Sequence, residues 1–349
     1  MLVGINYPWF DYGWDFGLGP PAWRGSRTVP RWFDDIDDHL ALFHDLGLSV
    51  VRWFILGDGL TYGTDDAAPR PDPLRPGQWR FNPPRLDADH LAHFRELLVR
   101  FSRFNAGTDR PVRLLPVLID FGFCEQGTRP VEQPDPADPM RTVADPAWVK
   151  CGRADVLVDS SKRSRFFDGV LEPLLAISQE HREALYAWEL INEPEWVTNG
   201  WHPDRRNNHP IGEASMRAFL EEGKERIRRA RFKPTIGFAL FATLERSRIT
   251  AEINQFHHYP DGGRRLAPHT FSAEFPAIVG EFATAETDVW PELAADDQTV
   301  LARLRRVDAL GYPVALPWSF HTRDTHTLWS PAVAQQIRTF TGAGRPPTT

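Results

Sequence analysis

Short apolar segments alternate along the chain with longer segments whose apolar residues recur at helical spacing. Several of the short segments are apolar at almost every position, as expected of strands that are covered on both faces. Most are followed by a helix-like segment, which is typical of an α/β fold with a parallel sheet. The strand candidates are Leu2–Tyr7, Ser49–Ile55, Val112–Ile119, Ala184–Ile191, Thr235–Phe241, Glu252–His257, Ala277–Glu281 and Pro313–Trp318.

The segments between these strands predict amphipathic helices. One contains Ile36, Leu40, Phe43 and Leu46, and the next contains Leu91, Phe94, Leu97, Leu98 and Phe101. Further candidates are Phe166–Ser178, Glu213–Arg231, Thr299–Leu310 and Pro331–Phe340, with weaker patterns after Phe241 and after Tyr259. Eight strands with intervening helices, in 349 residues, predict one (β/α)₈ TIM barrel with enlarged loops.

Two connections are unusually long and rich in Pro, Gly and Asp: Gly57–Asp87 and Phe121–Ser161. They would follow the second and third strands and overhang the C-terminal mouth of the barrel, where active sites of this fold lie. The chain has no linker or internal repeat before its last residues. We therefore expect one catalytic domain, residues 1–341, and a flexible tail, residues 342–349.

Composition and charge narrow the classes of partner. The formal net charge is −7, with acidic and basic residues interspersed, which argues against a nucleic-acid or membrane partner. The N-terminus lacks a basic segment followed by an apolar one, which predicts a cytoplasmic protein, or a secreted one if a signal peptide has been removed. The chain has 13 Trp and 23 Phe. Such rings stack on the C–H faces of sugars, although most of them would pack the core.

Motifs for metals and cofactors are absent from the sequence. There is no His-Glu-x-x-His, no Cys pair at zinc spacing, no EF-hand loop, no Walker A loop and no strand followed by Gly-x-Gly-x-x-Gly. Cys124 and Cys151 fall in one long loop, where two free thiols are expected, although a disulfide outside the cell stays open. The chemistry that we predict needs no cofactor.

Two strand candidates end in a glutamate. The fourth runs into Asn192-Glu193-Pro194, and because Pro194 cannot donate to a strand ladder, it leaves Glu193 at the strand tip. The seventh delivers Glu281 at its end. Cleavage of a glycosidic bond with retention of configuration needs two carboxyl groups about 5 to 5.5 Å apart. Two strand ends at one barrel mouth can meet that requirement.

This pattern resembles the clan A glycoside hydrolases, especially family 5, the cellulase and mannanase family. The resemblance implies that Glu193 is the general acid/base and Glu281 the nucleophile, and that Asn192 contacts the sugar 2-hydroxyl. Arg52, at the end of the second strand, resembles the arginine that keeps the nucleophile ionised. Its alternative role is a structural ion pair.

The sixth and eighth strands extend the resemblance. His257 or His258 with Tyr259 resembles the family's histidine and tyrosine, and Trp318 resembles the tryptophan beneath the −1 sugar. Adjacent strand residues face opposite ways, and His257 is favoured because it shares a face with Tyr259. The family usually has a histidine after the third strand. This chain has Asp120, which is a candidate for that polar contact or for a substrate contact.

Other residues compete for these roles. Glu189 lies inside the fourth strand and Glu195 lies past the proline, so both fit the acid/base role less well than Glu193. Aromatic residues near the mouth are candidate sugar platforms, and Trp196 and Trp201 are favoured because they follow the acid/base directly. The full set is Trp9, Trp53, Trp79, Trp196, Trp201 and Phe320.

The sequence therefore predicts a retaining β-glycoside hydrolase that acts on β-linked glucosides, mannosides or related oligosaccharides. One alternative is a non-catalytic barrel that binds carbohydrate. Another is a metal-dependent sugar isomerase on the same fold, which would need His, Asp and Glu ligands at the mouth. The sugar, its linkage and the oligomeric state are left open.

Overall fold

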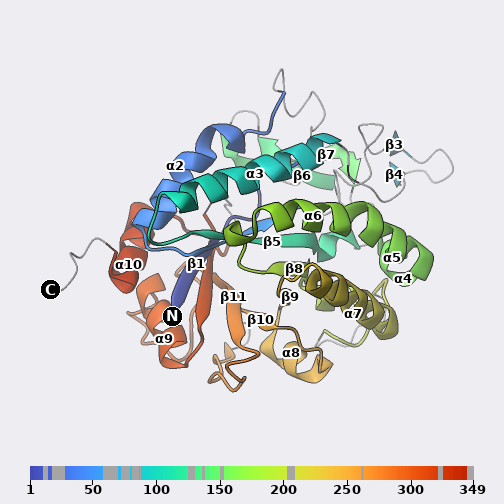
Figure 1. Cartoon of the computed structure of the whole chain (residues 1–349). Helices are drawn as coiled ribbons and strands as arrows, with labels where there is room; N and C mark the ends of the chain where they lie inside the picture. The colour runs from blue at the N-terminus through green and yellow to red at the C-terminus, as the bar shows by residue number, and fades with distance from the viewer. Residues whose placement is uncertain are drawn as a thin grey trace.

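Eight parallel strands close into a barrel in the order β1-β12-β11-β10-β9-β8-β5-β2 (Figure 1). The strands are β1 (Leu2–Asn6), β2 (Val50–Phe54), β5 (Arg113–Asp120), β8 (Trp188–Asn192), β9 (Pro234–Phe238), β10 (Ile253–His258), β11 (Ala277–Ala283) and β12 (Val314–Trp318). Each predicted strand corresponds to one of them, and the predicted (β/α)₈ fold is confirmed. The fourth begins later than predicted, because Ala184 belongs to a 3₁₀ turn, Arg182–Ala184.

The computed structural model describes most of the chain but leaves gaps in several loops. The described residues are 1–10, 15–17, 28–57, 70–71, 79–80, 86, 88–124, 130–135, 138–149, 153–202, 209–260, 263–320 and 325–343. For 70–71, 79–80, 130–135 and 138–149 the structure describes the backbone alone. The side chain of Trp79, the second cysteine, Cys151, and residues 344–349 of the predicted tail therefore lie outside the described residues, so whether Cys124 and Cys151 pair stays open.

Helices surround the barrel (Figure 1). They are α2 (Trp32–Asp45), α3 (Ala88–Ala106), α4 (Ala154–Val158), α5 (Ser160–Phe166), α6 (Glu172–Glu180), α7 (Glu213–Arg229), α8 (Phe241–Ser247), α9 (Val300–Ala309) and α10 (Pro331–Thr341). The single helix predicted over 166–178 is divided by a π-helical turn, Phe167–Leu171. Among the described residues between β10 and β11, no helix follows Tyr259, where the pattern was weak.

The interior of the barrel is layered, because alternate residues of each strand point inward. On β2 these are Val50, Arg52 and Phe54. An apolar layer fills the N-terminal end: Val50, Leu115, Ala187, Ile253, Ile278, Val314 and Leu316. Phe54, Val117 and Trp318 pack together nearer the C-terminal mouth. Between these two layers lies the buried guanidinium of Arg52, so the centre of this barrel is charged.

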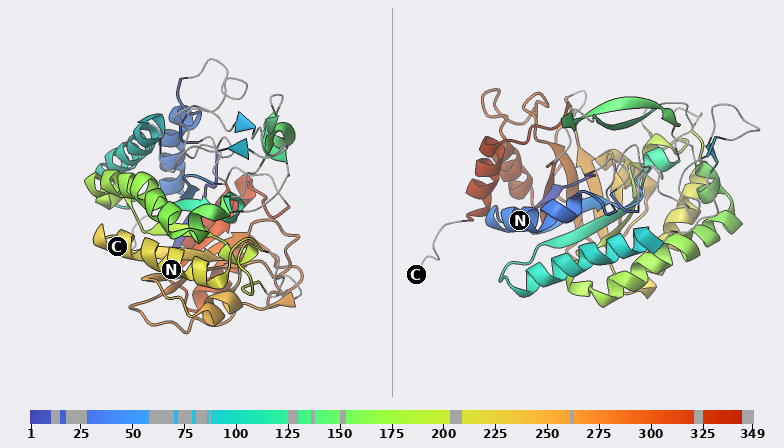
Figure 2. Two further views of the ribbon diagram at one scale, coloured as in Figure 1. Left: turned by 90° about the vertical axis from the view of Figure 1, so that its right-hand side faces the viewer. Right: turned by 90° about the horizontal axis from the view of Figure 1, so that it is seen from above.

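Each of the two long connections contains one antiparallel strand pair. The first holds β3 (Arg70–Pro71) and β4 (Trp79–Arg80), and the second holds β6 (Pro130–Asp135) and β7 (Asp138–Val149). In the right-hand view of Figure 2, β6 and β7 form a long twisted ribbon along one edge of the molecule. No helix among the described residues is long and apolar enough to cross a membrane.

Candidate active site

Glu193 lies at the turn where β8 ends. The strand stops at Asn192, and Pro194 opens a 3₁₀ turn, Pro194–Trp196. Glu193 itself adopts the left-handed conformation, with φ 47° and ψ 52°, and its N–H donates to the Gly237 carbonyl over 2.6 Å. For a residue with a side chain, such a backbone costs roughly 1–3 kcal/mol and is concentrated at functional sites. The strained turn aims the carboxyl group into the barrel mouth.

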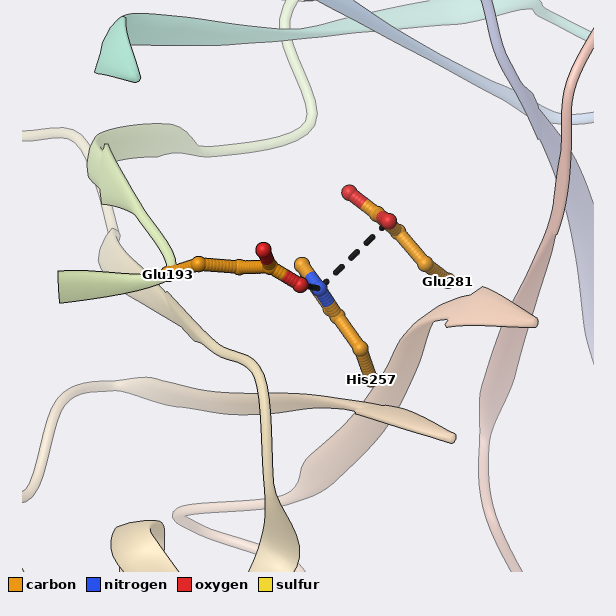
Figure 3. A group of neighbouring side chains, drawn as sticks. All are labelled: Glu193, His257 and Glu281. Atoms are coloured by element: carbon orange, nitrogen blue, oxygen red, sulfur yellow. Dashed lines mark hydrogen bonds and ion pairs between the residues drawn. The ribbon is translucent and has the colours of Figure 1, made fainter. Parts of the chain in front are cut away.

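Glu281 meets Glu193 across the mouth, with His257 between them (Figure 3). The register of β10 and β11 shifts after Phe256, which brings His257 opposite Glu281. The Nδ1 atom of His257 lies 2.8 Å from Oε1 of Glu193 and 3.5 Å from Oε2 of Glu281. An oxygen of each carboxyl group lies within 4.8 Å of an oxygen of the other. The two predicted catalytic residues therefore face one another.

Arg52 holds Glu281 from below. Its Nη1 donates to Oε1 of Glu281 over 2.6 Å and to Oδ1 of Asn6 over 2.8 Å. Its Nη2 donates to Oδ1 of Asn192 over 2.7 Å. Nε and Nη2 also donate to the two oxygens of Glu189, each over 2.7 Å. All five N–H donors of the guanidinium are thus used, which fixes its position.

Tyr259, Asn192 and Asp120 complete the polar site. The hydroxyl of Tyr259 donates to Oε2 of Glu281 over 2.9 Å, so both oxygens of that carboxylate accept a bond. The amide of Asn192 donates to Oδ1 of Asp120 over 2.9 Å. Asp120 also accepts from the Gly122 N–H over 3.0 Å. Asp120 therefore orients Asn192, in the place where the resemblance led us to expect a histidine.

The charges around the two carboxyl groups differ. Burial, and then the negative charge of Asp120, raise the pKa of Glu193 to about 7. A carboxyl group with this pKa is partly protonated at neutral pH and can donate a proton. Burial lowers the pKa of His257 to about 4, so that its imidazole is neutral at pH 7.

Burial also raises the pKa of Glu281, although His257 and Arg52 act to lower it. The sequence predicted that Arg52 would hold this pKa down. The net direction is the opposite, because desolvation of a fully buried carboxyl group outweighs one ion pair. The distinction between the two glutamates is therefore one of partners, since Glu281 accepts from a cation and a phenol while Glu193 lies near Asp120.

Trp196 is the aromatic residue that lies beside Glu193. Its indole N–H donates to Oε2 of Glu193 over 2.9 Å, and 42% of the residue is exposed. One face of the ring lies against His202, with centroids 4.2 Å apart. Trp318 lies near the mouth with Trp9, at a centroid distance of 6.1 Å. Of these rings, Trp196 is both exposed and bonded to Glu193.

The remaining candidate platforms are packed into the core. Trp201 is 3% exposed and its ring lies 5.9 Å from that of Phe238. Trp53 is buried and donates to Asp15, and Phe320 stacks on Tyr7. Chain proximity to Glu193 suggested a sugar contact for Trp201, but its burial favours a packing role.

The structure places the alternative candidates Glu195 and His258 in packing positions, and it shows four further polar residues in or near the site. Glu195 is buried away from the pair and accepts from the Leu240 N–H, and His258 packs edge-on against Trp290. Residues that the sequence did not single out are Asn6, Gln255, Asp288 and His326. The ring of His326 lies 4.8 Å from that of Tyr259. Nothing local marks these residues, because their roles come from contacts across the barrel.

Glu193, His257 and Glu281 also have the spacing of a metal site within the described part of the chain, since one ligand atom of each lies within 4.8 Å of the others. The carboxylate oxygens of Glu193 and Glu281 already accept hydrogen bonds from other side chains. Arg52 and Tyr259 donate to the two oxygens of Glu281, and Trp196 donates to Glu193. A guanidinium 2.6 Å from one ligand atom repels a cation, so the residues present fit a metal poorly.

Comparison with known proteins gives no match to a family model or to a curated protein. Solved structures do share the fold. A β-1,4-D-mannanase from Cryptopygus antarcticus has a TM-score of 0.65 and 18% identity, covering 98% of this chain and 90% of that chain. An endo-1,4-β-mannanase from Eisenia fetida has a TM-score of 0.64 and 18% identity, covering 99% and 91%.

A glycoside hydrolase family 5 mannosidase from Rhizomucor miehei has a TM-score of 0.51 and 11% identity, covering 97% of this chain and 92% of that chain. These likenesses extend over nearly the whole chain and concern its fold. In its fold, therefore, this chain resembles the family 5 glycoside hydrolases, as the motifs at its strand ends predict.

Proposed function

We propose that this protein is a retaining β-glycoside hydrolase. The observation that carries the proposal is the pairing of Glu193 and Glu281, whose oxygens approach within 4.8 Å across the barrel mouth. Inverting enzymes keep their carboxyl groups roughly 6.5–9.5 Å apart to admit a water, whereas retaining enzymes bring them to about 5–5.5 Å. The close approach supports the retaining mechanism.

In the first step Glu281 attacks the anomeric carbon while Glu193 gives its proton to the departing glycosidic oxygen. The bond from the anomeric carbon to that oxygen breaks, and a covalent ester to Glu281 forms. Arg52 and Tyr259 hold the attacking carboxylate by bonds of 2.6 and 2.9 Å, which leaves it little freedom to turn. Such fixed positioning lowers the entropic cost of reaching the transition state.

In the second step Glu193, now ionised, takes a proton from water, and the water oxygen displaces Glu281 from the sugar. The raised pKa of Glu193, about 7, suits a group that must give a proton and then take one back. Asn192 is placed to meet the sugar beside the pair, with its own orientation fixed by Asp120 and Arg52.

We propose β-linked mannosides and glucosides as the substrate class. Several proteins that share the fold are described as β-mannanases or a mannosidase, which makes a β-mannoside the first substrate to try. The half-exposed ring of Trp196, bonded to the acid/base, supports a sugar platform on the leaving-group side.

The test is hydrolysis of aryl β-mannosides, aryl β-glucosides and β-1,4-linked oligosaccharides by the wild type, Glu193→Ala and Glu281→Ala, each with and without azide. We expect wild-type turnover and losses of several orders of magnitude in both variants. Azide should rescue Glu193→Ala with a β-glycosyl azide product, and Glu281→Ala with an α-glycosyl azide. Chelation with EDTA should leave wild-type activity unchanged.

Each other outcome points to a different interpretation. Full activity in both variants would refute the site assignment, and loss of wild-type hydrolysis on chelation would show that the reaction depends on a metal ion. Binding of oligosaccharides without turnover on the whole panel would favour a carbohydrate-binding barrel.

A further inference from the structure

Glu189 is a second carboxylate inside the barrel. It lies on β8, four residues before Glu193, and is fully buried. Its two oxygens accept from Nε and Nη2 of Arg52, each over 2.7 Å, and so form a bidentate salt bridge. Gln255 donates to the same carboxylate over 2.8 Å. Paired bonds of this kind fix both position and direction.

Arg52 therefore serves two carboxylates with one positive charge. Glu189 takes two of its N–H bonds and Glu281 takes one. In a buried site charges interact more strongly than in water, so the way this single charge is shared affects every ionisable neighbour. The charged or ionisable groups around Arg52 and Glu189 are Glu281, Glu193, Asp120, His257 and Tyr259, from four different strands or strand ends.

The barrel wall is shaped to admit this second carboxylate. A Cβ atom on Gly237 would lie 2.2 Å from Oε1 of Glu189 and 3.2 Å from Nη2 of Arg52. A Cβ atom on Gly280 would lie 2.6 Å from the side chain of Gln255. Both glycines belong to barrel strands, and both leave room for the side chains of Glu189, Gln255 and Arg52, which any larger residue would contact too closely.

We propose that Glu189 is a positioning residue for the catalytic pair. It fixes the guanidinium of Arg52 beneath Glu281 and, as a buried anion, opposes the stabilisation that Arg52 gives to the ionised nucleophile. This inference rests on the proposed function, because it concerns how the hydrolase sets its working pH.

The effect has a definite sign. The charge of Glu189 already contributes to the raised pKa of Glu193, after burial and Asp120. Removing a nearby negative charge favours the ionised form of a carboxyl group and so lowers its pKa. Glu281 must be ionised and Glu193 protonated for the first step. Loss of the charge on Glu189 should therefore move both limbs of the pH profile to lower pH.

The test compares Glu189→Gln with wild type in the dependence of kcat/KM on pH, using an aryl β-glycoside that the wild type hydrolyses. We expect both limbs to move down by at least half a pH unit, and kcat to fall by roughly 10- to 100-fold because misplacement of reacting groups by about 1 Å costs this much. Glu225→Gln, which removes an exposed carboxylate paired with Arg229 on α7, is the matched control and should behave as wild type.

A second variant, Glu189→Asp, keeps the charge but shortens its reach. The limbs of its pH profile should stay at their wild-type positions while kcat falls. Circular dichroism and thermal melting establish that each variant is folded. Limbs unmoved in folded Glu189→Gln would overturn the charge role. Should Glu189→Gln not fold, Glu189→Asp with wild-type kcat would overturn the positioning role. Wild-type inactivity would count against the proposed function itself, which separates the two failures.

Discussion

At the scale of single residues, Trp196 contacts the proposed acid/base, Glu193, and is itself exposed. Its indole N–H bonds one oxygen of Glu193, and this bond lowers the pKa that burial and Asp120 raise. The same ring is exposed enough to meet a sugar. One side chain therefore has two separable effects, a hydrogen bond and an aromatic surface.

Replacing Trp196 with Phe should remove the bond and keep most of the surface. The ionised form of Glu193 then loses a donor, so its pKa should rise above about 7 and the basic limb of kcat/KM should move up by roughly half to one pH unit. The measurement is a pH profile on the active aryl glycoside. Trp201→Phe is the control, since Trp201 is buried against Phe238, and an equal shift there would contradict the role of Trp196.

At the scale of elements, β9 leaves room for the buried Glu189 because Gly237, which faces it, has no side chain. Gly237 faces Glu189, and the N–H of Glu193 donates to its carbonyl. This strand thus contacts both the buried pair of Glu189 and Arg52 and the strained turn at Glu193. A methyl group at Gly237 would displace the Glu189 carboxylate or move the backbone of β9.

Gly237→Ala should therefore destabilise the fold by about 1–3 kcal/mol, as overpacking of a core does, and lower kcat as well. Urea denaturation followed by circular dichroism measures the first effect and aryl glycoside hydrolysis the second. Gly107→Ala is a suitable comparison, because a Cβ there meets only the Phe104 carbonyl at 3.6 Å. Wild-type stability and rate in Gly237→Ala would contradict the prediction, because they would show that the neighbouring side chains can accommodate a methyl group at this position.

At the scale of the whole molecule, buried ionisable groups make stability depend on pH. Burial raises the pKa of Glu193 to about 7 and that of Glu195 to about 8, and lowers the pKa of His257 and His258 to about 4. A carboxyl group with a raised pKa contributes stability that is lost as pH rises through its folded pKa. The neutral histidines act in the opposite direction, but only between about pH 4 and 6.5.

The free energy of unfolding should therefore fall as pH rises from 6.5 to 8. Each carboxyl group that stays protonated in the fold contributes a slope of up to about 1.4 kcal/mol per pH unit. Glu195→Gln should flatten this slope, because the amide cannot ionise and Glu195 is bonded to Leu240 rather than to the catalytic pair. Urea denaturation at pH 6.5, 7 and 8 tests the expectation, and an unchanged slope in the variant would refute it.

Local pattern was enough to predict the fold. Each strand is a short apolar segment bounded by turn residues, so its position could be recognised without knowing its neighbours. The end of β8 could be predicted because Pro194 cannot continue a ladder. Over 166–178 the sequence predicted one helix. It missed the π-helical turn, Phe167–Leu171, that lies between α5 and α6.

By itself, the sequence determined the eight strands, most of the helices around them, and the two glutamates, of which Glu193 follows the last residue of β8 and Glu281 lies two residues before the end of β11. Only the tertiary structure decided which side chains contact one another, and above all that Glu189 and Glu281 both bond the guanidinium of Arg52. Arg52 meets Glu189 and Glu281 across 137 and 229 positions of the chain, and His257 meets Glu193 across 64. Such contacts depend on strand register and barrel closure. Burial, which raises the pKa of Glu193 and of Glu281, likewise exists only once the barrel has closed.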